Sequence, residues 1–542
     1  MGLSGASVPG SPRYIWEIDM KLTAANLFQD NMVLQRGKTV RIWGTSEPFT
    51  AISVRIQGIK EDTESDSSGN WQVTLPELKA SVSETLRIST QTETLTLHNI
   101  AVGEVWLAGG QSNMEFYMYY DQDYEAVLSM CDDPLIRFYD VPRIASKEHA
   151  ERFSYEKYGF WRQADAQNLK YFSAVAYYFA RALRADLNVP IGIIGCNWGG
   201  TRSCCWMDQD TLMHSGSVWM EDYEKGLASI PDIQEAREAY FTNPMSDPDQ
   251  VFDFEMRNKL MKGVSPDELM QMFEQFEEGG TGNYIGPWHE WRPCALYDNM
   301  VKTVMPFTLR GVIYYQGESD EDHPDIYADM LEGLTECWRR GFDDEMPFLM
   351  TQLAPLGEMI GQGGKYYPVL REQQRFAAQK LKKVWYASIG DVGDFYDIHP
   401  KKKRPVGERL AMLARGHVYH EKTLCDAPYG VKLTRKDNCL IISCEHAEGG
   451  LYISDNMPAP IRIFDPSGNQ ISETEYEVSV LNDKIIIMFN DEMASVPCRV
   501  EFAQTPFYKV NIYNMASIPA VPFTVTEDDK GTVLLSSKQE GV

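Results

Sequence analysis

Ser112 stands in a context where a serine could act as a nucleophile. It lies in the run Gly-Gly-Gln-Ser-Asn-Met-Glu, directly after the apolar run 104–109. A serine on a tight turn after a buried strand projects from the edge of a sheet, where backbone N–H groups of the turn can face a developing oxyanion. The match to Gly-x-Ser-x-Gly is incomplete because position 114 is Met. A serine after glycine is usually a turn or N-cap residue, so this motif needs support from other residues.

Three further polar stretches supply that support. Gly199 and Gly200 form a turn in which backbone amides can approach a ligand closely. Gln316 and Glu318 follow the apolar run 310–315, where such side chains could donate to an oxyanion, orient a base or contact the substrate. His399 is a candidate general base. Together the four stretches contain a nucleophile, oxyanion donors and a base, which is what acyl transfer requires.

Three aspartates precede His399, at positions 391, 394 and 397. A carboxylate beside an imidazole fixes its tautomer and stabilises its charged form. Asp397 is the first choice for this role because it is nearest in sequence. Asp391 and Asp394 are the alternatives, and a backbone carbonyl could also serve, giving a dyad. The basic run 401–404 that follows is expected to be the solvated start of a helix.

The elements that must position these residues can be predicted from their apolar runs. Strands are expected at 104–109, 190–195, 310–315, 347–353 and 383–389. They alternate with helices expected near 173–187 (with Ser173 as N-cap), 326–340, 370–382 and 405–417. This alternation is typical of a mainly parallel sheet covered on both faces. In such sheets the site forms beyond the carboxyl ends of the strands, so we expect the four polar stretches to meet there.

The remainder of the chain flanks or interrupts this α/β region. Short alternating runs with turn signals predict a β module at 21–100 and a β-sandwich module at 425–527. The hydrolase domain is then divided into 101–208 and 301–420. Residues 1–20 are expected to be a disordered or expression-derived start, and 528–542 a tail.

An acidic, aromatic-rich insertion is predicted at 209–300. Both of its ends are anchored near the expected site, so it could form a lid that shapes the leaving-group pocket. Trp288 and Trp291 are the candidates for contacting a sugar, because they lie in an irregular run containing Gly and Pro. The competing expectation is that the aromatic residues form the insertion's own core.

Composition excludes several classes of function. With 51 basic and 78 acidic residues the net charge is −27, which argues against nucleic-acid binding and against docking on an anionic membrane. No apolar run is long enough for a membrane span, and the first twenty residues do not resemble a signal peptide. The ten cysteines form no CxxC pair, which favours buried reduced thiols and makes a zinc site unexpected. These features predict a cytoplasmic protein, with the oligomeric state left open.

The motifs in their order resemble the sialate O-acetylesterase family of the SGNH hydrolases. The resemblance rests on GEVWLAGGQSNME, WGGT, YYQGESD and DIHP, and extends to LFQDNMVLQRGKTVRIWG, MPFLMTQLAP, GDVGDFYDIHPKKKRPVGERLA and VNIYNMASIPAVPF. It covers about four-fifths of the chain. It implies a three-layer α/β/α catalytic domain with a parallel sheet, flanked by β-sandwich modules.

The resemblance also implies residue roles. Ser112 would be the nucleophile and His399 the base, with oxyanion donors from the Ser112 backbone N–H, the Gly199-Gly200 turn and Gln316. Two departures from the family pattern matter. Many SGNH hydrolases carry the acid three residues before the histidine, where this chain has Tyr396. The asparagine of the third block has no clear counterpart, and Gln316 is the candidate to replace it.

We therefore expect a serine esterase that removes O-acetyl groups from carbohydrates without a metal or an organic cofactor. Two substrates compete: O-acetylated sialic acid, and acetylated hemicellulose fragments such as xylo- or manno-oligosaccharides, the substrates of acetyl xylan esterases. A sialic acid carboxylate would favour a cationic pocket, for which the net charge gives no support. A non-catalytic carbohydrate-binding protein is the alternative from another class, and the presence of both Ser112 and His399 argues against it.

Overall fold

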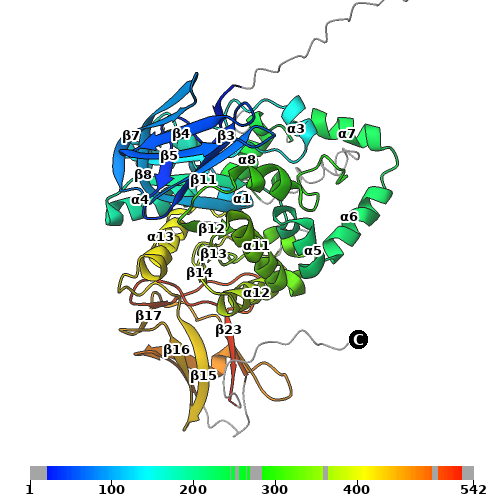
Figure 1. Ribbon diagram of the computed structural model, residues 1–542. Coiled ribbons are helices and arrows are strands. Elements are labelled where there is room, and N and C mark those ends of the chain that lie inside the picture. The colour runs from blue at the N-terminus through cyan, green and yellow to red at the C-terminus, as the bar shows by residue number, and fades with distance from the viewer. Residues whose placement is uncertain are drawn as a thin grey trace, which may run out of the picture.

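The computed structural model describes residues 21–244, 246–250, 255–263, 265, 267–268, 284–357, 364–490 and 499–527. Figure 1 shows a β-rich module in blue, a central α/β region in cyan to yellow, and a second β-rich module in orange and red. The expected start at 1–20 and tail at 528–542 lie outside the described residues. Within the described part of the chain, no helix has the length and apolarity that crossing a bilayer requires.

The central sheet contains the five strands expected from the sequence. Its order is β10 (Trp161–Ala164), β9 (Asp133–Asp140), β11 (Ile191–Asn197), β8 (Thr94–Gly110), β12 (Gly311–Tyr315), β13 (Phe348–Thr351) and β14 (Val384–Ala387). All neighbours are parallel except the β10–β9 pair at the edge. Strands β9 and β10 were not predicted. The mainly parallel arrangement is confirmed.

Helices cover both faces of this sheet, which confirms the three-layer architecture. On one face, Trp106 of β8 packs edge-on against Phe179 of α4 (Ala174–Leu187), and α13 (Arg404–Leu413) packs beside α4. On the other face, Tyr314 of β12 meets Trp338 of α11 (Tyr327–Phe342), next to α12 (Tyr367–Lys380). The Ser173 Oγ accepts the Ala176 N–H at 3.2 Å, so the expected N-cap of α4 is confirmed.

The N-terminal module and the central sheet share one strand. The first part of β8 pairs with β7 (Ser81–Ser89) and β2 (Val33–Gln35), and its last part lies between β11 and β12. The strand runs through the boundary expected near residue 100. The rest of the module consists of β1 (Thr23–Ala24), β3 (Val40–Thr45), β4 (Ala51–Ile56), β5 (Ile59–Glu64) and β6 (Asn70–Leu75).

The C-terminal module packs two main antiparallel sheets around its own core. One holds β15 (Tyr429–Lys436), β16 (Cys439–Glu445), β20 (Lys484–Phe489) and β19 (Tyr476–Leu481). The other holds β18 (Ile461–Phe464), β21 (Arg499–Phe502) and β23 (Phe523–Thr526), and β17 (Leu451–Ile453) pairs with β22 (Ile512–Asn514). Asp437 closes the β15–β16 hairpin with φ 52°. A sandwich built in this way agrees with the expectation from the alternating runs.

The insertion is helical where the structure describes it. Helices α5 (Gln209–Ser215), α6 (Val218–Ala228) and α7 (Ile233–Thr242) form the outer arc at the right of Figure 1, and α8 (Glu255–Lys262) lies closer to the middle. The aromatic residues at 252, 254, 273 and 276 lie outside the described residues. Nine cysteines are described; all are free thiols, and eight of them are buried.

Candidate active site

The register of the strands places three of the four polar stretches side by side at the carboxyl end of the sheet. Gly110, the last residue of β8, pairs with Asn197 of β11 on one side and with Tyr315 of β12 on the other. Ser112 begins the short helix α1 (Ser112–Glu115) directly afterwards. Within 111–118, Ser112 alone is not buried. The strand ends therefore present Ser112 to solvent from an otherwise packed turn.

The glycine turn of the second stretch lies against Ser112. A Cβ added to Gly199 would lie 3.2 Å from the Cβ of Ser112, so the two backbones are in close approach. Gly110 has φ 131°, and a Cβ there would meet the Tyr315 carbonyl oxygen at 2.0 Å. Glycine is required at Gly110 both for the backbone conformation and for the contact with β12.

Asn113 connects the nucleophile turn to the third and fourth stretches. Its Nδ2 donates to Glu318 Oε1 at 2.5 Å and to the backbone oxygen of Ile398 at 3.0 Å. Its Oδ1 accepts from Nζ of Lys403. Ile398 immediately precedes His399, so one buried side chain holds the histidine loop beside Ser112. The predicted convergence of the four polar stretches is confirmed.

Lys403 and Glu318 are buried on either side of Asn113. Lys403 is 1% exposed and lies over the Phe116 ring, so the expectation of a solvated basic run is wrong for this residue. Burial lowers the pKa of Lys403 to about 7. Burial likewise raises the pKa of Glu318 to about 7, against the opposing effects of the Asn113 hydrogen bond and the Lys403 charge. Among the described residues, Glu318 Oε2 has no hydrogen-bond partner.

Glu318 was expected to contact the substrate. The residue is only 7% exposed and its carboxylate accepts a hydrogen bond from Asn113, a position that suits holding the site together.

Two of the expected oxyanion donors already donate hydrogen bonds to acceptors within the protein. The Gly199 N–H donates to Glu115 Oε2 at 2.5 Å, and Arg143 holds the same carboxylate at 3.1 Å. The Gln316 amide donates to the Thr201 carbonyl at 3.2 Å and to Asp320. Both groups are thus engaged within the protein.

The Ser112 N–H belongs to the first turn of α1 and has no intrahelical acceptor. Gly200, with φ 74°, completes the turn beside it. The oxyanion roles of Ser112, Gly199, Gly200 and Gln316 stay predictions.

Asp397 contacts His399 through the backbone. Its Oδ1 accepts the His399 backbone N–H at 2.8 Å, and its Oδ2 pairs with Lys401 Nζ at 2.8 Å. Asp391 forms a bidentate pair with an arginine of α13, at 2.6 and 2.7 Å. Asp394 Oδ1 accepts the backbone N–H groups of the two residues that precede Ile398. The choice of orienting acid therefore stays a prediction, and Asp397 shapes the turn that carries His399.

The two candidate tryptophans of the insertion occupy different environments. The Trp291 indole lies against the turn formed by residues 198–201, which we call the WGGT turn. It is 3.2 Å from the position that a Cβ on Gly200 would occupy. Trp288 is 4% exposed and belongs to a small core with Ala236 and Tyr240. The structure thus places Trp288 in the core of the insertion and away from a sugar-facing lining, whereas Trp291 borders the site.

A small cavity opens beside Trp291. It has a volume of about 190 Å³, and its lining includes Arg202, Trp219, Asp222, Tyr223, Tyr284 and Trp291. The Arg202 guanidinium lies over the Trp219 ring, 4.9 Å from its centroid, and pairs with Asp322 at 2.7 Å. A cation and several aromatic faces therefore stand next to the WGGT turn.

Helix α8 closes another side of the site. The Tyr120 hydroxyl donates to Asn258 Oδ1 at 2.7 Å, and Lys262 Nζ donates to the Tyr119 hydroxyl at 2.8 Å. A Cβ at Gly263 would stand 3.6 Å from the Lys401 side chain. The insertion thus contacts the turn Met118–Tyr120, which follows the helix that begins at Ser112, and the histidine loop.

Comparison with known proteins gives consistent matches. Residues 278–414 match a family described as "carbohydrate esterase, sialic acid-specific acetylesterase". The sialate O-acetylesterase of Mus musculus is 26% identical over 94% of this chain and 95% of its own length; the Homo sapiens protein is 25% identical over 74% and 72%. A carbohydrate acetylesterase from Xanthomonas citri aligns with a TM-score of 0.70 and 26% identity, over 93% of this chain and 99% of its own. The family resemblance and the fold class are confirmed.

Proposed function

We propose, from its membership of the sialate O-acetylesterase family of carbohydrate esterases, that this enzyme removes acetyl groups from sugar hydroxyls through a covalent serine intermediate. One observation carries the proposal. Ser112, the only partly exposed residue of its turn, touches the WGGT turn, and its neighbour Asn113 holds the His399 loop. This arrangement supports the proposal because ester hydrolysis needs a nucleophile, an anion-binding turn and a base close together.

In the proposed reaction, Ser112 Oγ attacks the acetyl carbonyl while His399 takes its proton. The tetrahedral oxyanion faces the Ser112 N–H and the Gly200 side of the turn, and each such donor contributes about 3 kcal/mol in the transition state. The carbon–oxygen bond to the sugar then breaks, and His399 returns the proton to the sugar oxygen. Water, activated by His399, hydrolyses the acetyl-enzyme and releases acetate.

We assign Asn113, Glu318 and Lys403 a positioning role in this scheme. Their hydrogen bonds cross from the nucleophile turn to the third and fourth stretches. Holding Ser112 and His399 in register matters because a misplacement of about 1 Å can cost roughly 100-fold in rate.

O-acetylated sialic acid is the substrate that we propose. The observation in its favour is Arg202, which lines the cavity beside the WGGT turn and could bind a sugar carboxylate. Acetylated hemicellulose oligosaccharides are the second candidate. Asp222 lines the same cavity and Asp322 already pairs with Arg202, which suits a neutral sugar better.

Acetate release from a matched panel tests the assignment. The panel contains acetylated sialosides and acetylated xylo- and manno-oligosaccharides, assayed with the wild type, Arg202→Gln, and Arg55→Gln as an exposed control in β4. We expect the highest kcat/KM on the sialosides and a rise in KM of about tenfold or more for Arg202→Gln on sialosides only. Preference for neutral oligosaccharides with no effect of Arg202→Gln would establish the hemicellulose alternative. Absence of acetate release from every ester would favour the non-catalytic reading.

A further inference from the structure

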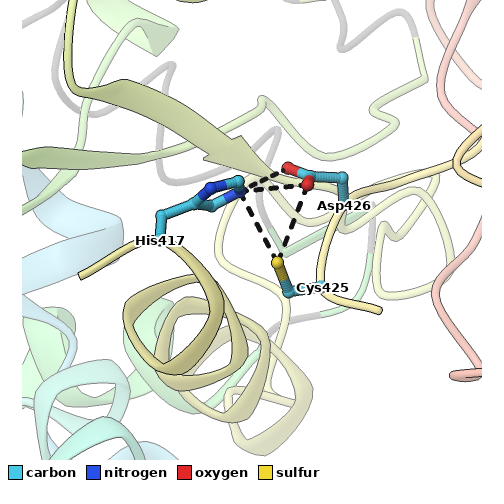
Figure 2. Close-up of side chains that lie close together, drawn as sticks. All are labelled: His417, Cys425 and Asp426. Atoms are coloured by element: carbon cyan, nitrogen blue, oxygen red, sulfur yellow. Dashed lines mark hydrogen bonds and ion pairs between the residues drawn. The ribbon is translucent and has the colours of Figure 1, made fainter. Parts of the chain in front are cut away.

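Three metal-ligating side chains meet at the junction of the α/β region and the C-terminal module. His417 lies in the π-helical turn Ala414–Val418 that continues α13, and Cys425 and Asp426 lie in the segment leading to β15. Figure 2 shows that the imidazole, the thiol and the carboxylate point toward one another. None of the three takes part in the proposed ester hydrolysis.

The distances among these atoms fit a single metal ion. Bonds of about 2.0 Å to nitrogen and oxygen and about 2.3 Å to sulfur, at tetrahedral angles, place ligand atoms roughly 3.3–3.6 Å apart. Cys425 Sγ lies 3.5 Å from His417 Nε2 and 3.6 Å from Asp426 Oδ2. His417 Nε2 lies 2.9 and 3.0 Å from the two Asp426 oxygens, so this pair would open by about 0.4 Å around an ion.

The protein holds each ligand by a separate contact. The His417 ring stacks on Trp385 of β14, with centroids 4.4 Å apart and planes at 11°. The backbone oxygen of Asp426 accepts from Asn514 Nδ2 at 3.0 Å. A Cβ on Gly416 would meet Cys425 Sγ at 2.3 Å, so glycine is needed for the thiol to reach this position. Such outer contacts orient the ligands of known metal sites.

A fourth ligand is within reach. His446 Nδ1 lies 4.0 Å from Asp426 Oδ2, and its side chain is partly exposed. A modest movement of this residue, or a water molecule, would complete four-coordination. His446 belongs to the loop after β16, so the four residues come from the α/β region, the connecting segment and the C-terminal module.

We propose that His417, Cys425 and Asp426 bind a zinc-type divalent ion, with His446 or water in the fourth position. One imidazole, one thiolate and one carboxylate form a ligand set of borderline softness that suits Zn²⁺ or Co²⁺. Binding displaces the Cys425 proton to solvent, as thiolate ligation requires. Helix α13 runs from the Lys403 end, at the candidate active site, to Leu413, roughly 15 Å away. The role is therefore structural: the ion fastens the C-terminal module to the α/β region.

Cobalt titration of the full chain, after removal of metals by a chelator, tests the proposal. We expect one equivalent of Co²⁺ to bind with visible bands of tetrahedral intensity and a thiolate-to-cobalt charge-transfer band. The charge-transfer band should be lost in Cys425→Ala and in His417→Gln, and retained in Cys439→Ala, a control at a half-buried cysteine of β16. Absence of any band in the wild type, or a band that survives in Cys425→Ala, would overturn the assignment.

Zinc-dependent stability provides a second readout, and its wild-type arm does not depend on how the variants fold. One equivalent of Zn²⁺ should raise the unfolding midpoint of the wild type by several degrees and leave that of Cys425→Ala unchanged. His446→Ala should weaken zinc binding if His446 is the fourth ligand. An unchanged wild-type midpoint, together with a negative cobalt titration, would show that the cluster is an ordinary ion pair with a neighbouring thiol.

Discussion

Asp397 is the residue at which the structure alters the expected chemistry most. Asp397 could play either of two roles: it could stabilise the charged imidazole of His399, or it could accept the His399 backbone N–H. The first role requires a negative charge, whereas the second requires only an acceptor oxygen. An amide oxygen at this position can still accept the backbone N–H, but it cannot stabilise an imidazolium electrostatically. The distance of 2.8 Å from Asp397 Oδ1 to the backbone nitrogen of His399 favours the second role.

We therefore predict that Asp397→Asn keeps kcat within about tenfold of the wild type, whereas Asp397→Ala loses far more because the turn is released. Steady-state acetate release by the two variants checks this. A loss of about 10⁴-fold in Asp397→Asn, as in triads with a true orienting carboxylate, would place Asp397 in the charge-stabilising role instead.

Glu318 makes stability depend on pH. Its pKa is raised from 4.5 to about 7 in the folded protein, so the folded state binds this proton more tightly than the unfolded chain does. The resulting stabilisation is fully present below about pH 4.5 and is lost as the pH rises through about 7. We predict that the unfolding midpoint of the wild type falls, relative to that of Glu318→Gln, by at least about 2 °C between these limits.

Calorimetric midpoints across this pH range measure the effect, with Glu336→Gln on the exposed side of α11 as the control. Parallel pH profiles for the wild type and Glu318→Gln would show that Glu318 does not hold a proton in the folded state.

At the residue scale, sequence patterns identified the reactive residues better than their partners. Ser112 and His399 stand out by type and context. The partner of the Gly199 N–H is Glu115, 84 positions earlier in the chain, and no local pattern reveals that contact. Lys403 was misjudged because charged runs are usually solvated; this side chain points inward to Asn113 just before α13 begins.

At the scale of elements, apolar runs predicted the buried strands because most residues of these strands are apolar. All five residues of β12 are buried. The missed strand β9 contains Arg137, a buried arginine that donates to the backbone oxygens of Asn31 and Asn99 at 2.9 and 2.6 Å. Arg137 can be buried because carbonyl groups far away in the sequence accept its hydrogen bonds. A charged residue interrupts the apolar pattern, so β9 could not be recognised from its own sequence.

The insertion provides a prediction at the same scale. Trp291 lies against Gly200 at the site, whereas Trp288 packs in the insertion's core. We predict that Trp291→Ala raises KM for the acetylated sugar by about tenfold, with little change for p-nitrophenyl acetate. Trp288→Ala should lower the unfolding midpoint and affect both esters alike. Equal effects of Trp291→Ala on the two esters would assign Trp291 to packing as well.

At the scale of the whole molecule, shared elements join the modules. Strand β8 belongs to both the N-terminal module and the central sheet, so the chain that leads to Ser112 is anchored along 17 residues, up to Gly110. Alternating runs and turn signals could indicate the modules, and net charge argued against nucleic-acid binding. Continuity of a strand across a module boundary depends on pairing with distant strands. The insertion then reaches back over the carboxyl edge of the same sheet.

In the mechanism that we propose, acetyl transfer passes through Ser112. The most direct test is the rate of acetate release from an acetylated sugar by Ser112→Ala, compared with the wild type and with Ser129→Ala, an exposed serine outside the site. We predict a loss of at least about three orders of magnitude for Ser112→Ala in a folded protein, because the members of such a site act as a unit. Activity of Ser112→Ala within tenfold of the wild type would contradict it.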